Sequence, residues 1–222
     1  MASSTDVVRT WLLQEQQQHK GIARTYDIMG RVYEIGNEQG KYEMALEQYG
    51  KCLAINIKAL GEDHPDVATT YGNIASVYYK QGKHEMALEQ YARCLAVEIK
   101  ALGEDHPSVA MTYNNTAVIC WWGQGKHEMA LEQYAKCLAI QIKTLGEDHP
   151  VVAATYTDNA MCKRNMADLL ERQGELARAG GLFRESAAIC RKVHGPQHAE
   201  TLYNLARARM CELLQTRALL AL

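Results

Sequence analysis

Histidine and acidic residues recur together in a six-residue segment, Leu-Gly-Glu-Asp-His-Pro, which starts at Leu60, Leu102 and Leu145. Imidazole and carboxylate groups are common zinc ligands and common general acids and bases. The three histidines are a full repeat apart, however, because the copies start 42 and 43 residues after one another. The Gly and Pro of each copy favour a turn. We therefore predict that these histidines and their acidic neighbours form structural turns and no metal site.

The remaining reactive residues also lack the spacing of a known site. His194 and His198 are four residues apart, but Gly195 and Pro196 lie between them and should prevent a shared helical face. The seven cysteines include no Cys-x-x-Cys pair, and three of them occupy the same place in successive repeats: Cys52, Cys94 and Cys137. We predict buried thiols of a reduced, cytoplasmic protein. There is also no Ser-His-Asp grouping and no Gly-rich phosphate loop. The sequence thus predicts a protein that is not an enzyme and has no catalytic residues, metal or cofactor.

Each repeat contains two apolar patterns with helical spacing, here called helix A and helix B. In the second copy, helix A carries Val67, Tyr71, Ile74, Ala75 and Tyr78, and helix B carries Met86, Ala87, Tyr91, Cys94 and Leu95. Steps of three and four residues place each set on one face of an α-helix. Gly82 lies between the two sets and can take the left-handed backbone conformation that ends a helix. One repeat is therefore expected to be a helical hairpin.

The Leu-Gly-Glu-Asp-His-Pro segment should end one hairpin and start the next. Gly103 follows helix B, and Pro107 suits the first turn of the next helix A, where no N–H is needed. Asp105 and His106 are the N-cap candidates, and Asp is the better acceptor of the two. One hairpin cannot bury both its faces, so the repeats are expected to stack.

The repeat resembles a known family. Tyr71, Ile74-Ala75, Tyr78, Gly82, Ala87, Tyr91 and Cys94 match the pattern of the tetratricopeptide repeat. The 42-residue period and the closing segment are similar to the long repeats of kinesin light chains, nephrocystin and bacterial relatives. The resemblance implies an all-α fold, namely a right-handed α-solenoid of helix-turn-helix hairpins with a C-terminal capping helix.

The resemblance covers about residues 22–215. We expect a polar lead-in at 1–21, which could form one or two amphipathic turns, and an apolar tail at 216–222. Between them we place four repeats and a cap, at about 22–60, 61–102, 103–145, 146–194 and 197–215.

Three repeats depart in length from the second copy. Repeat one has three extra residues, which we place in a longer loop at Ile35–Gln39. Repeat three has one extra residue within 119–125, which should bulge or shorten its helix A because one residue turns a helix by about 100°. Repeat four has seven extra residues. Seven residues are nearly two helical turns, so its helix A should simply be longer.

Charge and hydropathy exclude several classes of partner. The net charge of −2 gives no nucleic-acid or membrane electrostatic signature, and no apolar run approaches the ~20 residues of a membrane span. The N-terminus lacks the pattern of a signal peptide. We expect a cytoplasmic protein whose partner is another protein or a peptide.

In the family, helices A line the concave side of the array, where an extended peptide typically lies. The positions off the packing face of helix A are therefore the predicted peptide-binding groove: Asp27, Arg31, Thr69, Gly72, Ser76, Tyr79, Lys80, Thr112, Asn114, Val118, Arg164 and Asp168. Tyr113-Asn114-Asn115 resembles the kinesin-light-chain pattern whose first Asn faces cargo, which implies that role for Asn114. The two-carboxylate clamp of chaperone-tail binders needs a Lys and an Asn four residues apart on helix A, and the matching positions here do not carry them.

The sequence predicts a non-catalytic scaffold or adaptor that binds a peptide segment of a partner in this groove. One alternative is a kinesin-light-chain-like cargo adaptor in a kinesin-related or cytoskeletal complex. The long heptad region of such light chains would support it, and no sustained heptad pattern appears here. Another alternative is a structural spacer or oligomerising repeat fragment.

Overall fold

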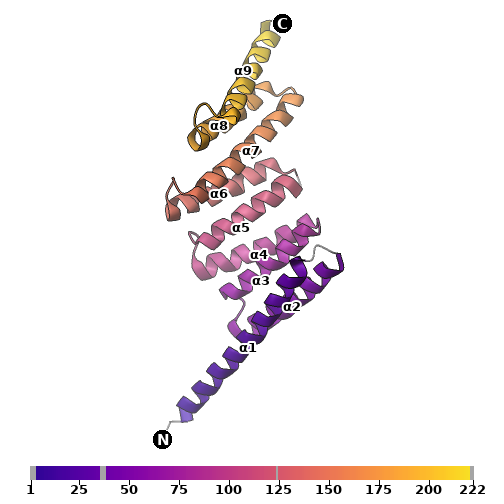
Figure 1. The fold of residues 1–222 in the computed structure, drawn as a ribbon, viewed down its shortest axis with the longest axis vertical. Coiled ribbons are helices and arrows are strands. Elements are labelled where there is room, and N and C mark those ends of the chain that lie inside the picture. The colour runs from indigo at the N-terminus through magenta and orange to yellow at the C-terminus, as the bar shows by residue number, and fades with distance from the viewer. Residues whose placement is uncertain (1–3, 36–38, 124, 221–222) are drawn as a thin grey trace. The chain divides into compact units, whose positions relative to one another are not determined.

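The computed structural model describes residues 4–35, 39–123 and 125–220, and within these ranges every regular element is helical (Figure 1). The helices are α1 (Ser4–Ile35), α2 (Gln39–Leu60), α3 (Pro65–Lys80), α4 (His84–Leu102), α5 (Pro107–Val118), a short π-helix η1 (Ile119–Gly123), α6 (His127–Leu145), α7 (Pro150–Arg172), α8 (Leu176–His194) and α9 (Ala199–Leu220). The all-α class predicted from the sequence is confirmed. The chain divides into two compact units, Met1–Thr112 and Tyr113–Leu222, which are described separately below.

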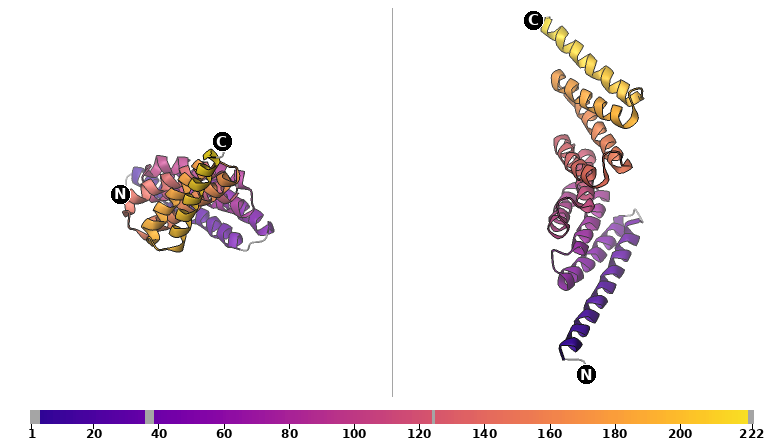
Figure 2. Two further views of the ribbon diagram at one scale, coloured as in Figure 1. Left: turned by 90° about the horizontal axis from the view of Figure 1, so that it is seen from above. Right: turned by 90° about the vertical axis from the view of Figure 1, so that its left-hand side faces the viewer.

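In the first unit, α1 packs against α2, α2 against α3, and α3 against α4. Figure 2 shows α1 running alongside α2. The core of this unit joins two successive repeats, because α2 and α3 contribute to one buried cluster: Tyr42, Ala45, Tyr49, Ile74 and Val77. Stacking of one hairpin on the next therefore buries the apolar faces that a single hairpin would expose.

The second unit repeats this arrangement. Helix α6 packs against α7, α7 against α8, and α8 against α9. Its core is a cluster from α7, α8 and α9: Met166, Ala167, Leu170, Ala179, Phe183, Ala208 and Cys211. Helix α9 is thus a helix A that covers the last hairpin, as the predicted capping helix should.

Histidine, and not aspartate, caps the A helices. His64 and His149 are the N-cap residues of α3 and α7, and the Nδ1 atom of each accepts the backbone N–H of the residue two positions on, at 3.1 and 3.2 Å. His106 and His198 make the same bond at 3.2 and 3.3 Å. Of the two N-cap candidates, Asp105 was predicted to be the better acceptor, and this was wrong. In α3, α5 and α7, Pro at the first helical position fixes the preceding His as the N-cap, whereas α9 begins with Ala199.

Replacing His106 with alanine should lower the free energy of unfolding by about 1 kcal/mol, because the backbone N–H of Ser108, the second residue of α5, loses its acceptor. Replacing His106 with aspartate should keep the stability within about 0.5 kcal/mol, since Asp is a good N-cap acceptor. Urea denaturation of both variants measures the difference. Equal stability of the alanine and aspartate variants would contradict the capping role.

The single inserted residue of repeat three forms a π-helix. The helix that begins as α5 continues into η1 (Ile119–Gly123), which accommodates one extra residue per turn without breaking the helix. Trp121 is buried, with its ring centroid 4.5 Å from that of His127, whereas Trp122 is 62% exposed. Of the two outcomes predicted for this insertion, the bulge is the one observed.

Three boundaries bear on the predicted organisation. Helix α7 has 23 residues against 16 in α3, so the seven extra residues lengthen helix A as predicted. The lead-in at 1–21 was expected to hold one or two turns, but α1 is a continuous helix from Ser4, since residues 4–20 contain no Gly or Pro. The tail at 216–222 likewise continues α9 as far as Leu220. The predicted loop at Ile35–Gln39 falls largely on residues 36–38, outside the described residues.

All seven cysteines are buried and free, as predicted. Burial raises the pKa of Cys94 to about 12 and that of Cys137 to about 11, so both thiols are protonated near neutral pH. In the ranges that the structure describes, no helix has the length and hydrophobicity needed to span a membrane.

Candidate functional site

A buried polar layer joins successive hairpins at equivalent positions. In the first unit, Oγ1 of Thr70 on α3 lies 3.6 Å from Sγ of Cys52. The same oxygen accepts a hydrogen bond from Asn56 Nδ2 at 3.4 Å. In the second unit, Asn204 Nδ2 donates to Ser186 Oγ at 3.1 Å and lies 3.7 Å from Cys190 Sγ. Each layer ties the end of one helix B to the start of the next helix A.

Thr112 belongs to this layer and not to a groove, which corrects its predicted role. It is 4% exposed, and its Oγ1 donates to Glu98 Oε2 at 2.7 Å. Thr112 matches Thr70 of the preceding repeat, whereas the match of Thr69 is Met111. The prediction was therefore one residue out of register.

Glu98 is the only carboxylate among the matching helix-B positions, where repeat one has Asn56 and repeat three has Gln141. Its side chain is buried between α4 and α5. Burial raises the pKa of the Glu98 carboxyl, although the hydrogen bond from Thr112 acts in the opposite direction. A raised folded-state pKa means that this group favours folding when protonated, and that its contribution is lost as the pH rises through that pKa.

Replacing Glu98 with glutamine should therefore stabilise the protein at pH 7, by on the order of 1 kcal/mol. The gain should shrink on acidification, because the wild-type carboxyl then becomes protonated. Urea denaturation of both proteins at several pH values measures this difference. A gain that grows on acidification would contradict the assignment.

The carboxylate of Glu34, near the end of α1, contacts two of the predicted groove residues, Ser76 and Lys80. It accepts from Ser76 Oγ at 2.7 Å and pairs with Lys80 Nζ at 2.9 Å. It also accepts from the hydroxyl of Tyr49 at 3.0 Å, and burial together with this carboxylate raises the pKa of Tyr49. Ser76 and Lys80 are thus brought together on the A-helix face, and Glu34 neutralises the positive charge of Lys80.

Asp27 and Thr69 line a cavity of about 320 Å³ between α1, α2 and α3. Asp27 accepts a hydrogen bond from Asn73 Nδ2 at 2.8 Å, which joins α1 to α3. The rest of its lining comes from the same three helices: Lys20, Ala23, Arg24, Cys52, Asn56, Asp66 and Thr70.

The other predicted residues of the first unit lie around this face. Arg31 is exposed, and Tyr79 is half-buried with its ring centroid 5.8 Å from that of His84. A Cβ added at Gly72 would lie 3.7 Å from Cys94 Sγ, so this position faces α4.

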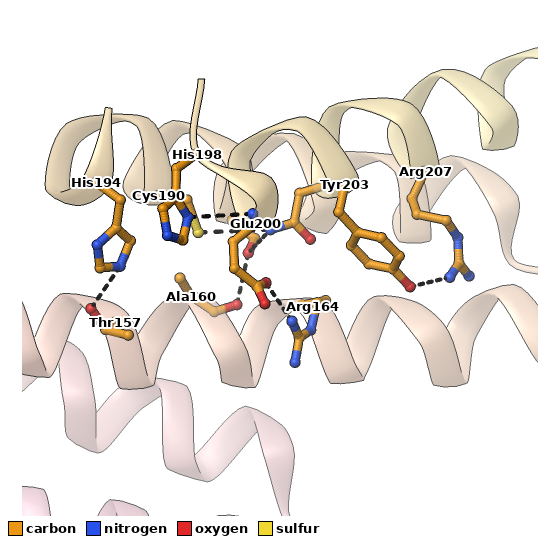
Figure 3. A network of polar contacts seen from close by, with 11 residues as sticks. Thr157, Ala160, Arg164, Cys190, His194, His198, Glu200, Tyr203 and Arg207 are labelled. Carbon is orange, nitrogen blue, oxygen red and sulfur yellow. Dashed lines mark hydrogen bonds and ion pairs between the residues drawn. The ribbon is translucent and has the colours of Figure 1, made fainter. Parts of the chain in front are cut away.

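In the second unit, Asn114 and Val118 are half-buried on α5. Arg164 pairs with Glu200 of α9 (Figure 3), and Asp168 pairs with Arg207 Nη2 at 2.9 Å. Both residues therefore hold α9 against α7, and their charges are compensated within the unit.

A second cavity, of about 270 Å³, lies between α7, α8 and α9. His194 and His198 line it with stacked rings whose centroids are 4.6 Å apart (Figure 3). Gly195 and Pro196 were predicted to prevent a shared helical face, and His194 does end α8 while His198 lies in the following turn; that turn brings the two rings together. Since His198 Nδ1 already accepts the N–H of Glu200, its neutral form carries a proton on Nε2 and offers no lone pair to a metal. In the part of the chain that the structure describes, no group of three or more His, Cys, Asp or Glu side chains is arranged to hold a metal ion.

Four residues that organise the A-helix faces were not predicted from the sequence: Glu34, Asn73, Glu200 and Arg207. Each pairs with a residue on a neighbouring helix A, 36 to 46 positions away in the sequence. Charged or amide residues at matched positions of successive A helices are the signal that could have identified them.

Comparison with known proteins agrees with this geometry. The tetratricopeptide repeat model matches residues 22–100, 70–143 and 157–215, so the chain belongs to the tetratricopeptide repeat family. A search of curated proteins returns no match.

Among solved structures, a Podosopora anserina putative kinesin light chain with nearly identical TPR-like repeats is 25% identical, with a TM-score of 0.59, over 88% of this chain and 89% of that one. Its Q17M form gives 25% identity and a TM-score of 0.58, over 88% of each chain. BtubC (BKLC) from P. vanneervenii is 20% identical, with a TM-score of 0.57, over 99% of this chain and 92% of that one, and supports the fold alone.

Tetratricopeptide repeats are generally non-catalytic interaction scaffolds whose partners are proteins. The chain is therefore a protein-interaction repeat scaffold.

Proposed function

We propose that this scaffold binds an extended segment of a partner protein, and that in the first unit the segment lies along α1 and α3. The observation that carries the proposal is the cavity between α1, α2 and α3, because Asp27 and Thr69 line it and were both predicted as groove residues from the sequence. A concave site next to polar side chains on two adjacent A helices suits one anchoring side chain and the backbone of an extended peptide.

Thr69 offers a direct test, since it is exposed at the edge of this cavity and its hydroxyl donates only to the backbone oxygen of Pro65, at 3.1 Å. A tryptophan at this position would fill the opening. Thr216 is the matched control, because it is also exposed and donates to the backbone oxygen of Glu212 at 2.9 Å. Thr69→Trp should block peptide binding, and Thr216→Trp should not.

Binding segments are selected from a display library of extended peptides on the intact chain and are then measured by fluorescence anisotropy. We expect Thr69→Trp to raise the Kd at least tenfold and Thr216→Trp to leave it within twofold. Segments that bind both variants equally well would place the binding surface elsewhere. Failure of the folded wild type to select any segment would count against the proposal as a whole.

A second candidate function is that of a kinesin-light-chain-like cargo adaptor. It is supported by the similarity to the Podosopora anserina structures and by the Tyr-Asn-Asn pattern at Asn114. The test is a labelled peptide with a tryptophan flanked by acidic residues. We expect micromolar binding that Asn114→Ala weakens at least tenfold and that Asn115→Ala, also half-buried on α5, leaves unchanged. No binding by the folded wild type would exclude this peptide class.

A further inference from the structure

The two cavities are lined from equivalent positions of two repeats, but their charges differ. Asp27 in the first cavity matches Arg164 in the second, and Asp66 matches Glu200. In the second cavity, Arg164 Nη1 and Glu200 Oε2 form an ion pair across the junction between α7 and α9 (Figure 3). In the first cavity, the same two positions both carry carboxylates. At this pair of positions the second cavity therefore holds a guanidinium group that the first does not, although Arg24 lines the first cavity elsewhere.

The interior of the first cavity also contains an unused acceptor. Asn56 is 5% exposed, and its amide nitrogen donates to Cys52 Sγ at 3.5 Å and to Thr70 Oγ1 at 3.4 Å. Its carbonyl oxygen accepts no hydrogen bond from the described part of the chain. Cys52 lies at the same place, and the pKa of its thiol is raised by burial and then by the charges of Asp27 and Asp66. The negative charges of Asp27 and Asp66 are therefore close enough to the interior of the cavity to affect Cys52, which lines it together with Asn56.

Asp27 accepts a hydrogen bond from Asn73 and Asp66 Oδ2 lies 3.6 Å from His64 Nδ1, but the lysine and arginine at this cavity pair with neither carboxylate. Lys20 and Arg24 line the cavity at the positions that Thr157 and Met161 hold in the second copy, and both are exposed. Among the residues that the structure describes, neither forms an ion pair with Asp27 or Asp66.

We propose that the cavity between α1, α2 and α3 binds the guanidinium group of an arginine in the partner segment, an inference that rests on the proposed function. Asp27, Asn56 and Asp66 supply acceptors from three helices, and a planar guanidinium with five N–H donors matches several acceptors at once. A lysine ammonium is a compact, more strongly hydrated charge and suits this set less well. Acidic residues that flank the arginine would contact Lys20 and Arg24 at the rim.

A small probe tests the cavity without any knowledge of the partner. The ¹⁵N-labelled intact chain is titrated with Nα-acetyl-arginine amide, and in parallel with its neutral isostere Nα-acetyl-citrulline amide. We expect the arginine probe at millimolar concentration to shift the side-chain amide signal of Asn56 and the backbone signals of Asp27 and Asp66. The citrulline probe should shift them at least fivefold less. No shift with the arginine probe, or equal shifts with both probes, would overturn the proposal.

Protein variants supply the second half of the test. Asp27→Asn/Asp66→Asn keeps the side-chain shapes and should weaken the arginine probe at least tenfold. Asp63→Asn is the matched control, because the Asp63 side chain is about as exposed as that of Asp66 but pairs with Lys100 outside the cavity. Full affinity of the double variant for the probe would overturn the assignment of the two carboxylates. Thermal unfolding of each variant confirms that it is folded.

The selected partner segments separate this inference from the proposed function. If the segments contain an arginine whose replacement by citrulline raises the Kd at least tenfold, both stand. If the segments bind, are blocked by Thr69→Trp and tolerate citrulline, the proposed function stands and the guanidinium site is refuted. If no segment binds, the proposed function fails, and the probe titration still decides for or against the cavity.

Discussion

Replacing Phe183 with alanine is expected to lower the free energy of unfolding by about 3–5 kcal/mol, the range for deleting a buried aromatic ring. Phe183 is fully buried at the centre of the core that α7, α8 and α9 share, where Met166, Leu170 and Ala208 surround it. The variant would leave a cavity at the junction between the last hairpin and its cap. Because the repeats are stabilised by their neighbours, the loss should affect all three helices.

The Arg207 guanidinium lies over the Phe183 ring, 4.9 Å from its centroid, and pairs with Asp168 and Glu171. Phe183→Ala removes this cation–π contact as well as the packing. Phe183→Leu keeps most of the apolar volume and should cost about 1–1.5 kcal/mol. Urea denaturation followed by circular dichroism measures both variants. A loss below about 1 kcal/mol for Phe183→Ala would mean that this cluster is not the core of the unit.

The helical hairpins could be predicted because each one depends on a pattern of residues that are close together in the sequence. Apolar spacing defines the faces, and glycines with positive φ follow most of the helices, with φ of 72° at Gly82 and 90° at Gly103. The longer α7 follows from the same logic, since seven residues preserve the helical face. The N-cap could not be chosen from residue preference alone, because proline at the first helical position fixed His106 in a place where Asp105 is chemically favoured.

The outcome of the inserted residue in repeat three could not be predicted from spacing. A bulge and a shortened helix were both compatible with the sequence. The structure keeps Ile119, Cys120 and Trp121 buried and accommodates the extra residue in η1, which leaves Trp122 at the surface. The choice therefore depends on tertiary packing, which no local pattern records.

Two features limited how well the groove residues could be predicted from the sequence: the register of each helix A and the pairing of side chains across repeats. A shift of one residue turns a helix by about 100°, which is why Thr112 was assigned to an open face and is buried, whereas Met111 is 61% exposed. Lys80 and Ser76 were assigned to the same face of helix A, but the pairing of Lys80 with Glu34 depends on how α1 stacks on α3. Such contacts join residues a whole repeat apart and cannot be derived from one repeat alone.

Gly30→Ala and Gly50→Ala are expected to change stability in opposite directions, although both glycines lie within helices. Alanine has the higher helix propensity by about 1 kcal/mol. Gly50 is exposed and has no heavy atom within 4 Å of an added Cβ, so Gly50→Ala should stabilise by about 0.5–1 kcal/mol. At Gly30 the added Cβ would lie 2.6 Å from Cε1 of Tyr49. Overpacking of a core costs about 1–3 kcal/mol, so Gly30→Ala should destabilise by about 1–2 kcal/mol.

The ring of Tyr49 has little freedom to move away, because it is fully buried and its hydroxyl is held by Glu34. A double-mutant cycle isolates this contact. In a Tyr49→Ala background the clash is absent, so Gly30→Ala should become stabilising, as Gly50→Ala is in the wild type. Urea denaturation of the four proteins gives the coupling energy. If Gly30→Ala stabilised the wild type as much as Gly50→Ala does, the close approach of α1 and α2 at Gly30 and Tyr49 would be refuted.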